Sequence, residues 1–455
     1  MQLSTSSISQ ILLLSGENKM SEQRKNLKKY IIPSMLGNIS FFILTIVDGI
    51  FVGNGVGTDA LGAVSLAMPY VMIVSAFTTL FNIGGVTVAS VRFGRGDTEG
   101  ANQAFMHALS LGIVVFSVMS AVGFLFSDSI AVILGANDTY REMVSTYVHW
   151  YSLFLLPMAV FYCMNGFARN DGNPNISLVC AVTCTAVNIF GDWLLVFPLG
   201  RGIAGAAFAT GFSNFVAMFV ALSHYVLKKG QLRIKGFRPQ LSLYRKILLR
   251  GIPEMIAQFA SPITTYSMNN MLLNNLGNAA VNAFSVISYA SSLFASLMYG
   301  LSGGLQPLYS YSYGARDDKS LKYYFNAGRT MAVAGGLGIF ALTFFIGKPV
   351  AILFGADESA FALVRSAMPR YCLNFVFAAI NAVYSSYLFS TKRTTYAITL
   401  SACRSLIFNF CCINFLPLIF GHEFIWYTVA VSEGICLIIA AVLRKMSERN
   451  GIKYM

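Results

Sequence analysis

Long apolar runs are the feature that most limits what this chain can fold into. Twelve runs of about twenty or more residues lie between clusters of charged and turn-forming residues, and about 20 apolar residues suffice for a helix to cross a bilayer. The runs occupy residues 31–53, 61–91, 102–126, 142–167, 175–197, 203–227, 252–275, 281–311, 324–346, 366–389, 396–419 and 424–443. Because lipid cannot pair with backbone polar groups, they predict an all-α membrane protein with twelve transmembrane helices.

The charge of the chain is sparse and one-sided. Hydrophobic residues make up 56% of the 455 residues and charged residues 11%, which is too little charge for a soluble surface of this size. Of the 32 Lys and Arg residues, 26 lie on the side of the two termini and 4 on the opposite side. Basic residues favour the cytoplasmic side, so both termini are predicted in the cytoplasm. The net charge of +13 is therefore attributed to orientation, and no nucleic-acid partner is expected.

Sequence signals of enzymes are absent. The eight cysteines lie in apolar runs without CxxC spacing, the four histidines are scattered, and no GxxxxGK[ST] loop occurs. These observations argue against metal, redox or ATP-driven chemistry, so the chain is predicted not to be an enzyme and to need no cofactor. Residues 1–25 are expected to form a disordered tail, and Met20 offers an alternative start to Met1.

The chain contains an internal repeat. An offset of 220 residues aligns Pro33 with Pro253, Gly84 with Gly304, Gly94 with Gly314, Asp97 with Asp317 and Tyr151 with Tyr371. Two homologous six-helix bundles are implied, at residues 26–228 and 245–455, joined by a basic linker at 229–244. An even number of spans in each half makes the repeat parallel. Two such halves that rock about a central cleft are typical of a transporter.

Apart from Glu142, which is the first residue of its run, four acids lie inside the apolar runs, namely Asp48, Asp192, Glu254 and Glu433. A charged side chain at the centre of a membrane helix costs roughly 2.5–3.5 kcal/mol on insertion scales, so each is a candidate for a functional role. Asp48 and Asp192 lie at one depth, in the half of the membrane remote from the termini. Glu254 follows Pro253 near the cytoplasmic interface, where it serves either function or a local contact with Arg250 or water. Glu433 has no partner that the sequence identifies.

Polar neighbours accompany the two aspartates. Asn188 precedes Asp192 by four residues and so lies on the same helix face, and Thr210 reaches a similar depth in the next run. Carboxylate, amide and hydroxyl oxygens suit Na⁺ or a proton. The alternative is that each acid makes only a hydrogen bond to a neighbouring helix. At the 220-residue offset the aspartates become Met268 and Cys412, so the predicted site belongs to the N-terminal half alone.

Several motifs carry a resemblance to a known family. The run ending in VDGIFVG, the FGRGD and YGARD segments after the second and eighth runs, and NIFGD before Trp193 resemble the multidrug and toxic compound extrusion family over about residues 25–445. The resemblance implies twelve helices in two lobes and a sodium or proton site at Asp48, Asn188, Asp192 and Thr210, with the backbone of Ala206. Glu254 resembles an acid that some members use for coupling.

The resemblance implies a secondary active multidrug exporter, which antiports lipophilic organic cations against Na⁺ or H⁺. It would be a monomer in the inner membrane of a bacterium, in contact with lipid. Two alternatives remain at this point. A flippase for a lipid-linked or amphipathic precursor would favour a basic cavity, and few bases, among them Arg370 and Arg404, lie inside the runs. A gated channel is compatible with the composition.

Overall fold

The computed structural model describes residues 5–353 and 358–449, and nearly all of them are helical. The described part contains no strand. Its N-terminal helices are α1 (Thr5–Gly55), α2 (Thr58–Gly94), α3 (Thr98–Leu125), α4 (Ser127–Ile133), α5 (Asp138–Leu153), α6 (Leu155–Asn170), α7 (Asn175–Val196), α8 (Gly202–Val226) and α9 (Leu241–Ala257). The remaining helices are α10 (Ala260–Leu276), α11 (Asn278–Gly314), α12 (Asp318–Leu353), α13 (Glu358–Cys372), α14 (Asn374–Ser390), α15 (Thr394–Ala402), the π-helix η1 (Cys403–Phe408), α16 (Asn409–Phe420), the 3₁₀-helix η2 (His422–Tyr427) and α17 (Thr428–Arg449).

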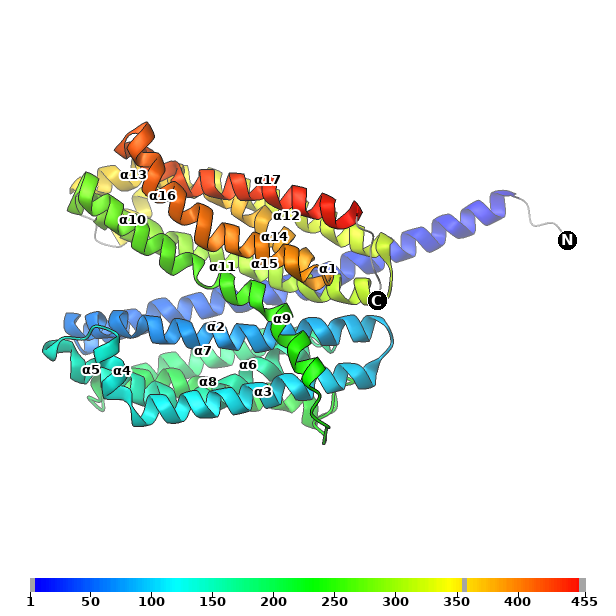
Figure 1. Cartoon of the computed structure of the whole chain (residues 1–455), viewed down its shortest axis with the longest axis horizontal. Coiled ribbons are helices and arrows are strands. Elements are labelled where there is room, and N and C mark those ends of the chain that lie inside the picture. Colours follow the sequence, from blue (N-terminus) through cyan, green and yellow to red (C-terminus); the bar gives the residue numbers. More distant parts are fainter. Residues whose placement is uncertain (1–4, 354–357, 450–455) are drawn as a thin grey trace.

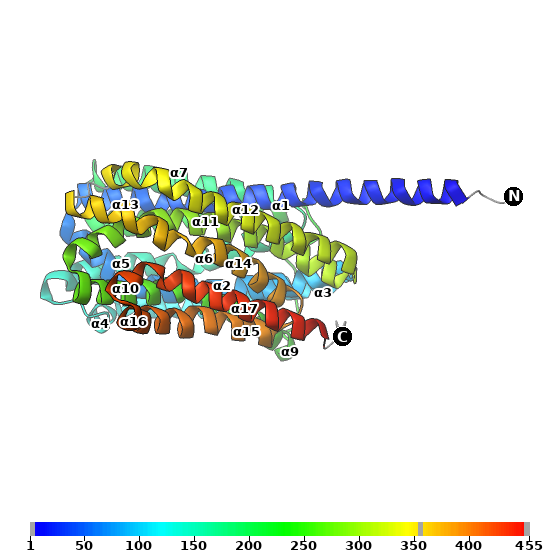
Figure 2. The same cartoon turned by 90° about the horizontal axis from the view of Figure 1, so that it is seen from above.

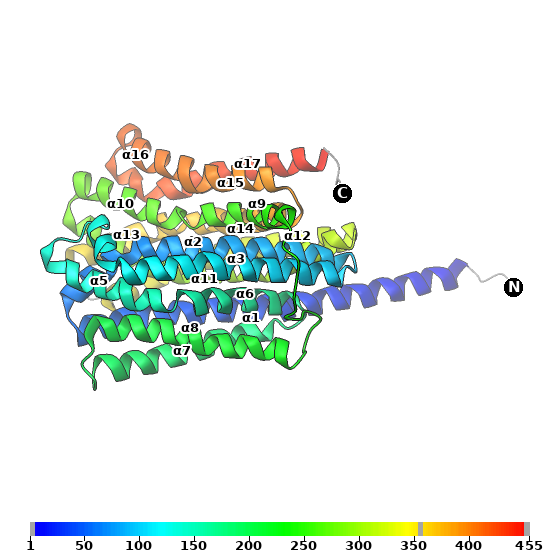
Figure 3. The same cartoon turned by 60° about the horizontal axis from the view of Figure 1, so that its bottom comes forward.

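The helices form two bundles that lie side by side. Helices α2 to α8 make up one bundle and α10 to α17 the other (Figure 1). Seen from another side, α7 and α8 mark one edge of the molecule and α15 to α17 the opposite edge (Figure 3). Helix α1 packs against α7 of the first bundle and against α11 of the second, and α9 packs against both α2 and α15. These two helices therefore connect the bundles.

The predicted all-α class with many membrane spans is confirmed. Ten helices of the described residues are long and apolar enough to cross a membrane, and the number is eleven if α5 and α6, which are bent by 51° at their junction, are counted together as one span. The predicted run 252–275 falls on α9 and α10, which are separated at Gln258 and Phe259. This segment carries Glu254 and the polar sequence TTYSMNN, so it is less apolar than the other spans.

Close glycine contacts join the bundles at the end of the molecule where the chain termini lie. A Cβ atom at Gly94 of α2 would overlap the backbone of Tyr311 and Gly314 of α11, and a Cβ at Gly314 would overlap Val91 and Gly94. Gly94 and Gly314 are equivalent under the 220-residue repeat. Contact between equivalent residues is the arrangement that a two-fold axis between parallel repeats produces.

The linker at 229–244 is held against the first bundle. The buried Asp171 accepts hydrogen bonds from the backbone amides of Gln231 (2.8 Å) and Leu232 (3.0 Å) and lies 3.0 Å from His224 Nε2. Further along, His107 Nε2 accepts from the amide of Gln240 at 2.9 Å. His149 Nδ1 lies 3.0 Å from the carbonyl oxygen of Phe124. Three of the four histidines therefore have structural partners, in agreement with the absence of a histidine motif.

Helix α1 extends beyond the bundles toward the N-terminus (Figure 2). Its first part covers most of the segment predicted as a disordered tail, residues 1–25. That tail and the predicted boundaries 26–228, 229–244 and 245–455 stay predictions.

Candidate functional site

The two aspartates in the N-terminal half lie together, as the sequence predicts. Asp48 lies near the C-terminal end of α1 and Asp192 lies on α7, and their carboxyl groups contact each other. Asp192 is fully buried. Oδ1 of Asp48 and both oxygens of Asp192 are buried and receive no hydrogen bond from the described residues. Two adjacent carboxyl groups in a low dielectric cannot both stay charged without a compensating cation or proton.

The remaining predicted ligands surround this pair. Asn188, one turn before Asp192 on α7, contacts the Asp192 carboxyl group, and its Nδ2 donates to Thr210 Oγ1 of α8 at 3.4 Å. The Thr210 hydroxyl in turn donates to the carbonyl of Ala206 at 3.1 Å. All five predicted residues, from three helices, are thus connected. Whether they bind an ion stays a prediction.

The chemistry of the cluster fits a small hard cation or a proton. Besides the three carboxyl oxygens, Oδ1 of the fully buried Asn188 has no hydrogen-bond donor among the described residues. Unpaired buried oxygens are costly, and Na⁺ or H⁺ would satisfy them. The described residues hold no group of three or more His, Cys, Asp or Glu side chains that would suit a transition metal.

A pair of tyrosines, not singled out from the sequence as part of the site, links this cluster to the space between the bundles. The buried Tyr147 of α5 lies within electrostatic range of both Asp48 and Asp192. Its ring stacks on that of Tyr151, with centroids 5.9 Å apart and an interplanar angle of 11°. Tyr151 also lines a cavity between the bundles. Their spacing is the sequence signal that could have identified them, because two tyrosines four residues apart lie on the same face of a helix.

A cavity of about 490 Å³ lies between the bundles. Residues of α1, α2, α5 and α6 line one side, and residues of α9, α11, α14, α15 and η1 line the other. We call it the central cleft. Its lining combines hydroxyl and amide groups with the aromatic rings of Tyr151, Tyr162, Tyr299 and Phe389. Asp48 and Asp192 are not among the residues that line it.

Glu254 does line the central cleft, beside Arg404. The structure also supplies the partner of Glu433 that the sequence did not reveal. Nε of Arg404 lies 2.8 Å from both carboxylate oxygens of Glu433, and Nδ2 of Asn381 donates to Glu433 Oε2 at 2.7 Å. Glu433 is therefore paired within the C-terminal bundle.

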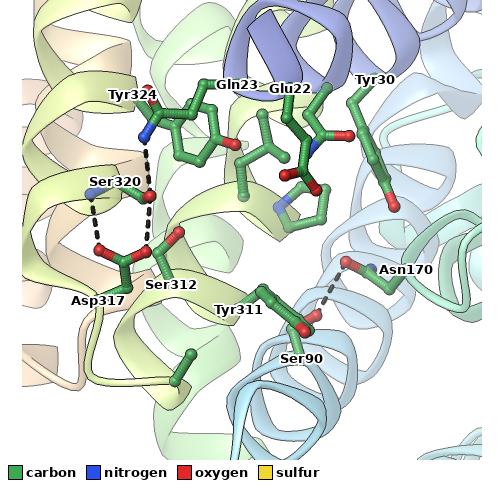
Figure 4. A pocket seen from close by; sticks show the side chains of 14 residues that line it. Glu22, Gln23, Tyr30, Ser90, Asn170, Tyr311, Ser312, Asp317, Ser320 and Tyr324 are labelled. Carbon is green, nitrogen blue, oxygen red and sulfur yellow. Dashed lines mark hydrogen bonds between the residues drawn. The ribbon is translucent and has the colours of Figure 1, made fainter. Parts of the chain in front are cut away.

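A second cavity, of about 320 Å³, is lined by residues of α1, α2, α6, α11 and α12 (Figure 4). Gln23 of α1 donates from Nε2 to Ser320 Oγ of α12 at 2.9 Å, and the Ser320 hydroxyl donates to Asp317 Oδ2 at 2.7 Å. On the other side Ser90 Oγ donates to Asn170 Oδ1 at 2.8 Å. These contacts tie α1 to the C-terminal bundle and α2 to α6.

Comparison with known proteins identifies the family. The MatE family model matches residues 33–194 and again residues 253–413. The chain belongs to the MatE family. The two matches begin 220 residues apart, as 253 minus 33, which is the offset of the internal repeat. Members of this family are transporters, so the predictions of a membrane transporter and of a protein that is not an enzyme are confirmed.

Individual relatives agree with this assignment. The chain is 27% identical over 292 residues to the multidrug export protein MepA of Staphylococcus haemolyticus, which covers 64% of each chain. It is 23% identical over 431 residues to MepA of Staphylococcus aureus, which covers 92% of this chain and 93% of the relative. A crystal structure of MATE in complex with MaL6 superposes with a TM-score of 0.89 at 22% identity, over 95% of this chain and 98% of the other.

Proposed function

We propose that this chain is a secondary active multidrug exporter, which antiports lipophilic organic cations against Na⁺ or H⁺ by alternating access of its two bundles. Membership of the family and the name of the MepA relatives support export of small molecules. Export against a gradient requires a coupling ion, because the chain has no phosphate-binding loop for ATP.

The observation that carries the proposal is the buried pair Asp48 and Asp192. Three carboxyl oxygens of the pair have no donor among the described residues, and the stacked rings of Tyr147 and Tyr151 connect the pair to the central cleft. A cation or proton that enters the cluster removes the repulsion between the carboxylates. Tyr147 and Tyr151 then transmit a change in packing to the cleft. The ion and the exported cation favour different arrangements of the bundles. Binding of one therefore lowers the population of the arrangement to which the other binds.

The orientation follows from charge. The excess of basic residues on the side of the termini supports a cytoplasmic location for both of them. The apolar outer surfaces of the helices support a multi-pass protein of a bacterial inner membrane, in contact with lipid. We further propose that it functions as a monomer, because each chain holds both halves of the repeat and so a complete cleft.

Reconstitution into proteoliposomes tests the function. Vesicles are loaded with a fluorescent organic cation, and its movement is measured under an imposed Na⁺ gradient, an imposed pH gradient, or neither. We expect uphill movement of the dye with one of the two gradients. Movement that only follows the dye's own gradient would indicate a channel, and no movement under any condition would contradict multidrug export.

A flippase for a lipid-linked or amphipathic precursor is the second candidate. One observation favours it: two arginines, Arg169 and Arg404, line the central cleft, and guanidinium groups bind phosphate. Arg169 comes from α6 and was not counted among the bases inside the runs. Transfer of a fluorescent lipid-linked diphosphate between the leaflets of the same vesicles distinguishes this function from drug export.

A further inference from the structure

We propose that a phosphate group binds outside the central cleft, in a cluster of basic side chains where the two bundles meet at the end of the molecule that carries the termini. We call this cluster the basic seam. Its members are Arg92, Arg95, Lys246, Arg250, Lys392 and Arg393. The phosphate is either the head group of an anionic phospholipid or a free phosphate, since both offer the same oxygen atoms. The inference goes beyond the proposed export function and does not depend on which substrate is exported.

The basic seam draws on both bundles. Two of its members lie at the end of α2, two lie on α9, and two lie in the turn between α14 and α15. Helix α9, which lies between the bundles (Figure 1), packs against α2 and α15. The buried Tyr313 of α11 lies within electrostatic range of Arg95, Arg250 and Arg393. Members that are remote in the sequence therefore gather around one residue.

Two guanidinium groups of the seam have a buried nitrogen atom without an acceptor. Nη1 of Arg250 and Nη1 of Arg393 are buried and make no hydrogen bond to any of the described residues. A buried donor without an acceptor costs roughly 1–3 kcal/mol, and more when it is charged. Phosphate oxygens accept pairs of parallel hydrogen bonds from guanidinium groups. A bound phosphate would supply the acceptors that both nitrogen atoms lack.

The members of the basic seam also repel one another. The charged groups that act on Lys392 are four other members of the seam, and all four are basic. Burial, together with the field of these bases, lowers the pKa of Lys392 to about 8. One carboxylate, Asp97, acts on Arg92, but it caps α3 by accepting a hydrogen bond from the Gly100 amide at 2.7 Å. A phosphate with one or two negative charges would turn the repulsion into attraction.

The internal repeat shows that the fold does not require these bases. At the 220-residue offset, four members of the seam have neutral equivalents, because Arg92, Arg95, Lys246 and Arg250 correspond to Ser312, Ala315, Asn26 and Tyr30. All four equivalents line the second cavity, of about 320 Å³. The described lining of that cavity contains no Lys or Arg and two acids, Glu22 and Asp317. The basic charge therefore belongs to one of two places that the repeat makes equivalent, as expected for a ligand site.

Orientation in the membrane does not explain where these bases lie. A base that only orients the chain can stay in solvent, as the exposed Arg238 of the linker does. In the seam Arg95 and Lys246 are exposed, whereas Arg92, Arg250 and Lys392 are half-buried. The cluster is thus open to solvent on one side and extends between the helices. Basic pockets of this kind, between membrane helices on the cytoplasmic side, bind anionic lipid head groups.

Binding of lipid and of phosphate to the purified full-length protein tests the inference. Native mass spectrometry measures the affinity for phosphatidic acid and for phosphatidylcholine, whose head group has no net charge. Thermal unfolding in detergent is compared in sodium phosphate and in sodium chloride of equal ionic strength. We expect the wild-type protein to prefer phosphatidic acid. Arg250→Gln and Arg393→Gln should each weaken the binding of phosphatidic acid about ten-fold, as expected for the loss of a charged hydrogen bond.

Controls separate binding from folding and from general charge. Arg238→Gln removes an exposed base of the linker and should bind phosphatidic acid like the wild type. Because Arg250→Gln removes repulsion, we expect it to unfold in chloride at no lower temperature than the wild type.

The outcomes identify the source of the phosphate. Stabilisation of the wild type by free phosphate as well as by phosphatidic acid would support a general phosphate site, and stabilisation by phosphatidic acid alone would support a lipid site. The inference would be overturned if the wild type showed no preference for phosphatidic acid, or if Arg250→Gln and Arg393→Gln bound it as tightly as the wild type. No ion gradient is involved, so this result is independent of the test of export.

Discussion

Asp192 is a fully buried carboxyl group inside a membrane helix. It has no donor for either oxygen among the described residues, and its closest polar neighbours are Asp48 and Asn188. A structural acid in a membrane helix would be expected to have a donor. The proposal that Asp192 binds an ion or proton rests on this missing donor.

The variant Asp192→Asn tests this role. The amide keeps the shape of the side chain and relieves the repulsion from Asp48, so we expect folding to be preserved and gradient-driven efflux to be lost. Efflux in proteoliposomes and thermal unfolding of the purified protein measure the two effects. Asp128→Asn is the control, because Asp128 lies at the surface in an ion pair with Arg141 that holds its pKa below the usual range. Efflux by Asp192→Asn at the wild-type rate would rule out the coupling role.

Glu254→Gln is expected to have a smaller effect. Glu254 lines the cleft rather than the buried aspartate cluster, so its loss should weaken substrate binding and reduce transport only in part. The measurement compares initial efflux rates of Glu254→Gln and Asp192→Asn at equal protein levels. A loss for Glu254→Gln as large as that for Asp192→Asn would reverse this ranking of the two acids.

At the scale of helices, contacts between glycines allow the two bundles to approach each other closely. Gly94 and Gly314 allow α2 and α11 to touch backbone to backbone at the end that carries the termini. In a transporter with alternating access, such a contact must form in one state and separate in the other. The absence of side chains there lets the contact form without repacking.

We expect Gly94→Ala to hinder this contact. The added Cβ would overlap the backbone of Tyr311, and overpacking of this kind costs about 1–3 kcal/mol. That cost corresponds to a shift of about 5- to 150-fold in the balance between the two arrangements, seen as a slower efflux rate. Gly338→Ala is the matched control, because a Cβ at this helical glycine of α12 meets no atom within 4 Å. Equal rates for the two variants would show that the contact is not part of the transport cycle.

The helices illustrate what the sequence can and cannot predict. Apolar runs and the 220-residue repeat predict most elements, because burial in lipid depends on composition alone. The aspartate cluster was also predictable, since depth along a helix can be counted. The pairing of Arg404 with Glu433 was not. It depends on how η1 faces α17, and helix rotation is set by packing. The same holds for Tyr147, which reaches the aspartates from a third helix.

For the whole molecule, we propose a topology with both termini and the linker in the cytoplasm, because of the parallel repeat and the charge distribution. Cysteine labelling in intact bacterial cells tests it. Leu199 precedes α8 on the side remote from the termini and is 53% exposed, whereas Lys229 is exposed in the linker. A membrane-impermeant maleimide should label Leu199→Cys in intact cells and Lys229→Cys only after permeabilisation. The wild-type chain provides the background, because its eight cysteines are free and six of them are buried. Labelling of Lys229→Cys in intact cells would show that the orientation is the opposite one. The direction in which the central cleft releases its substrate would then be reversed as well.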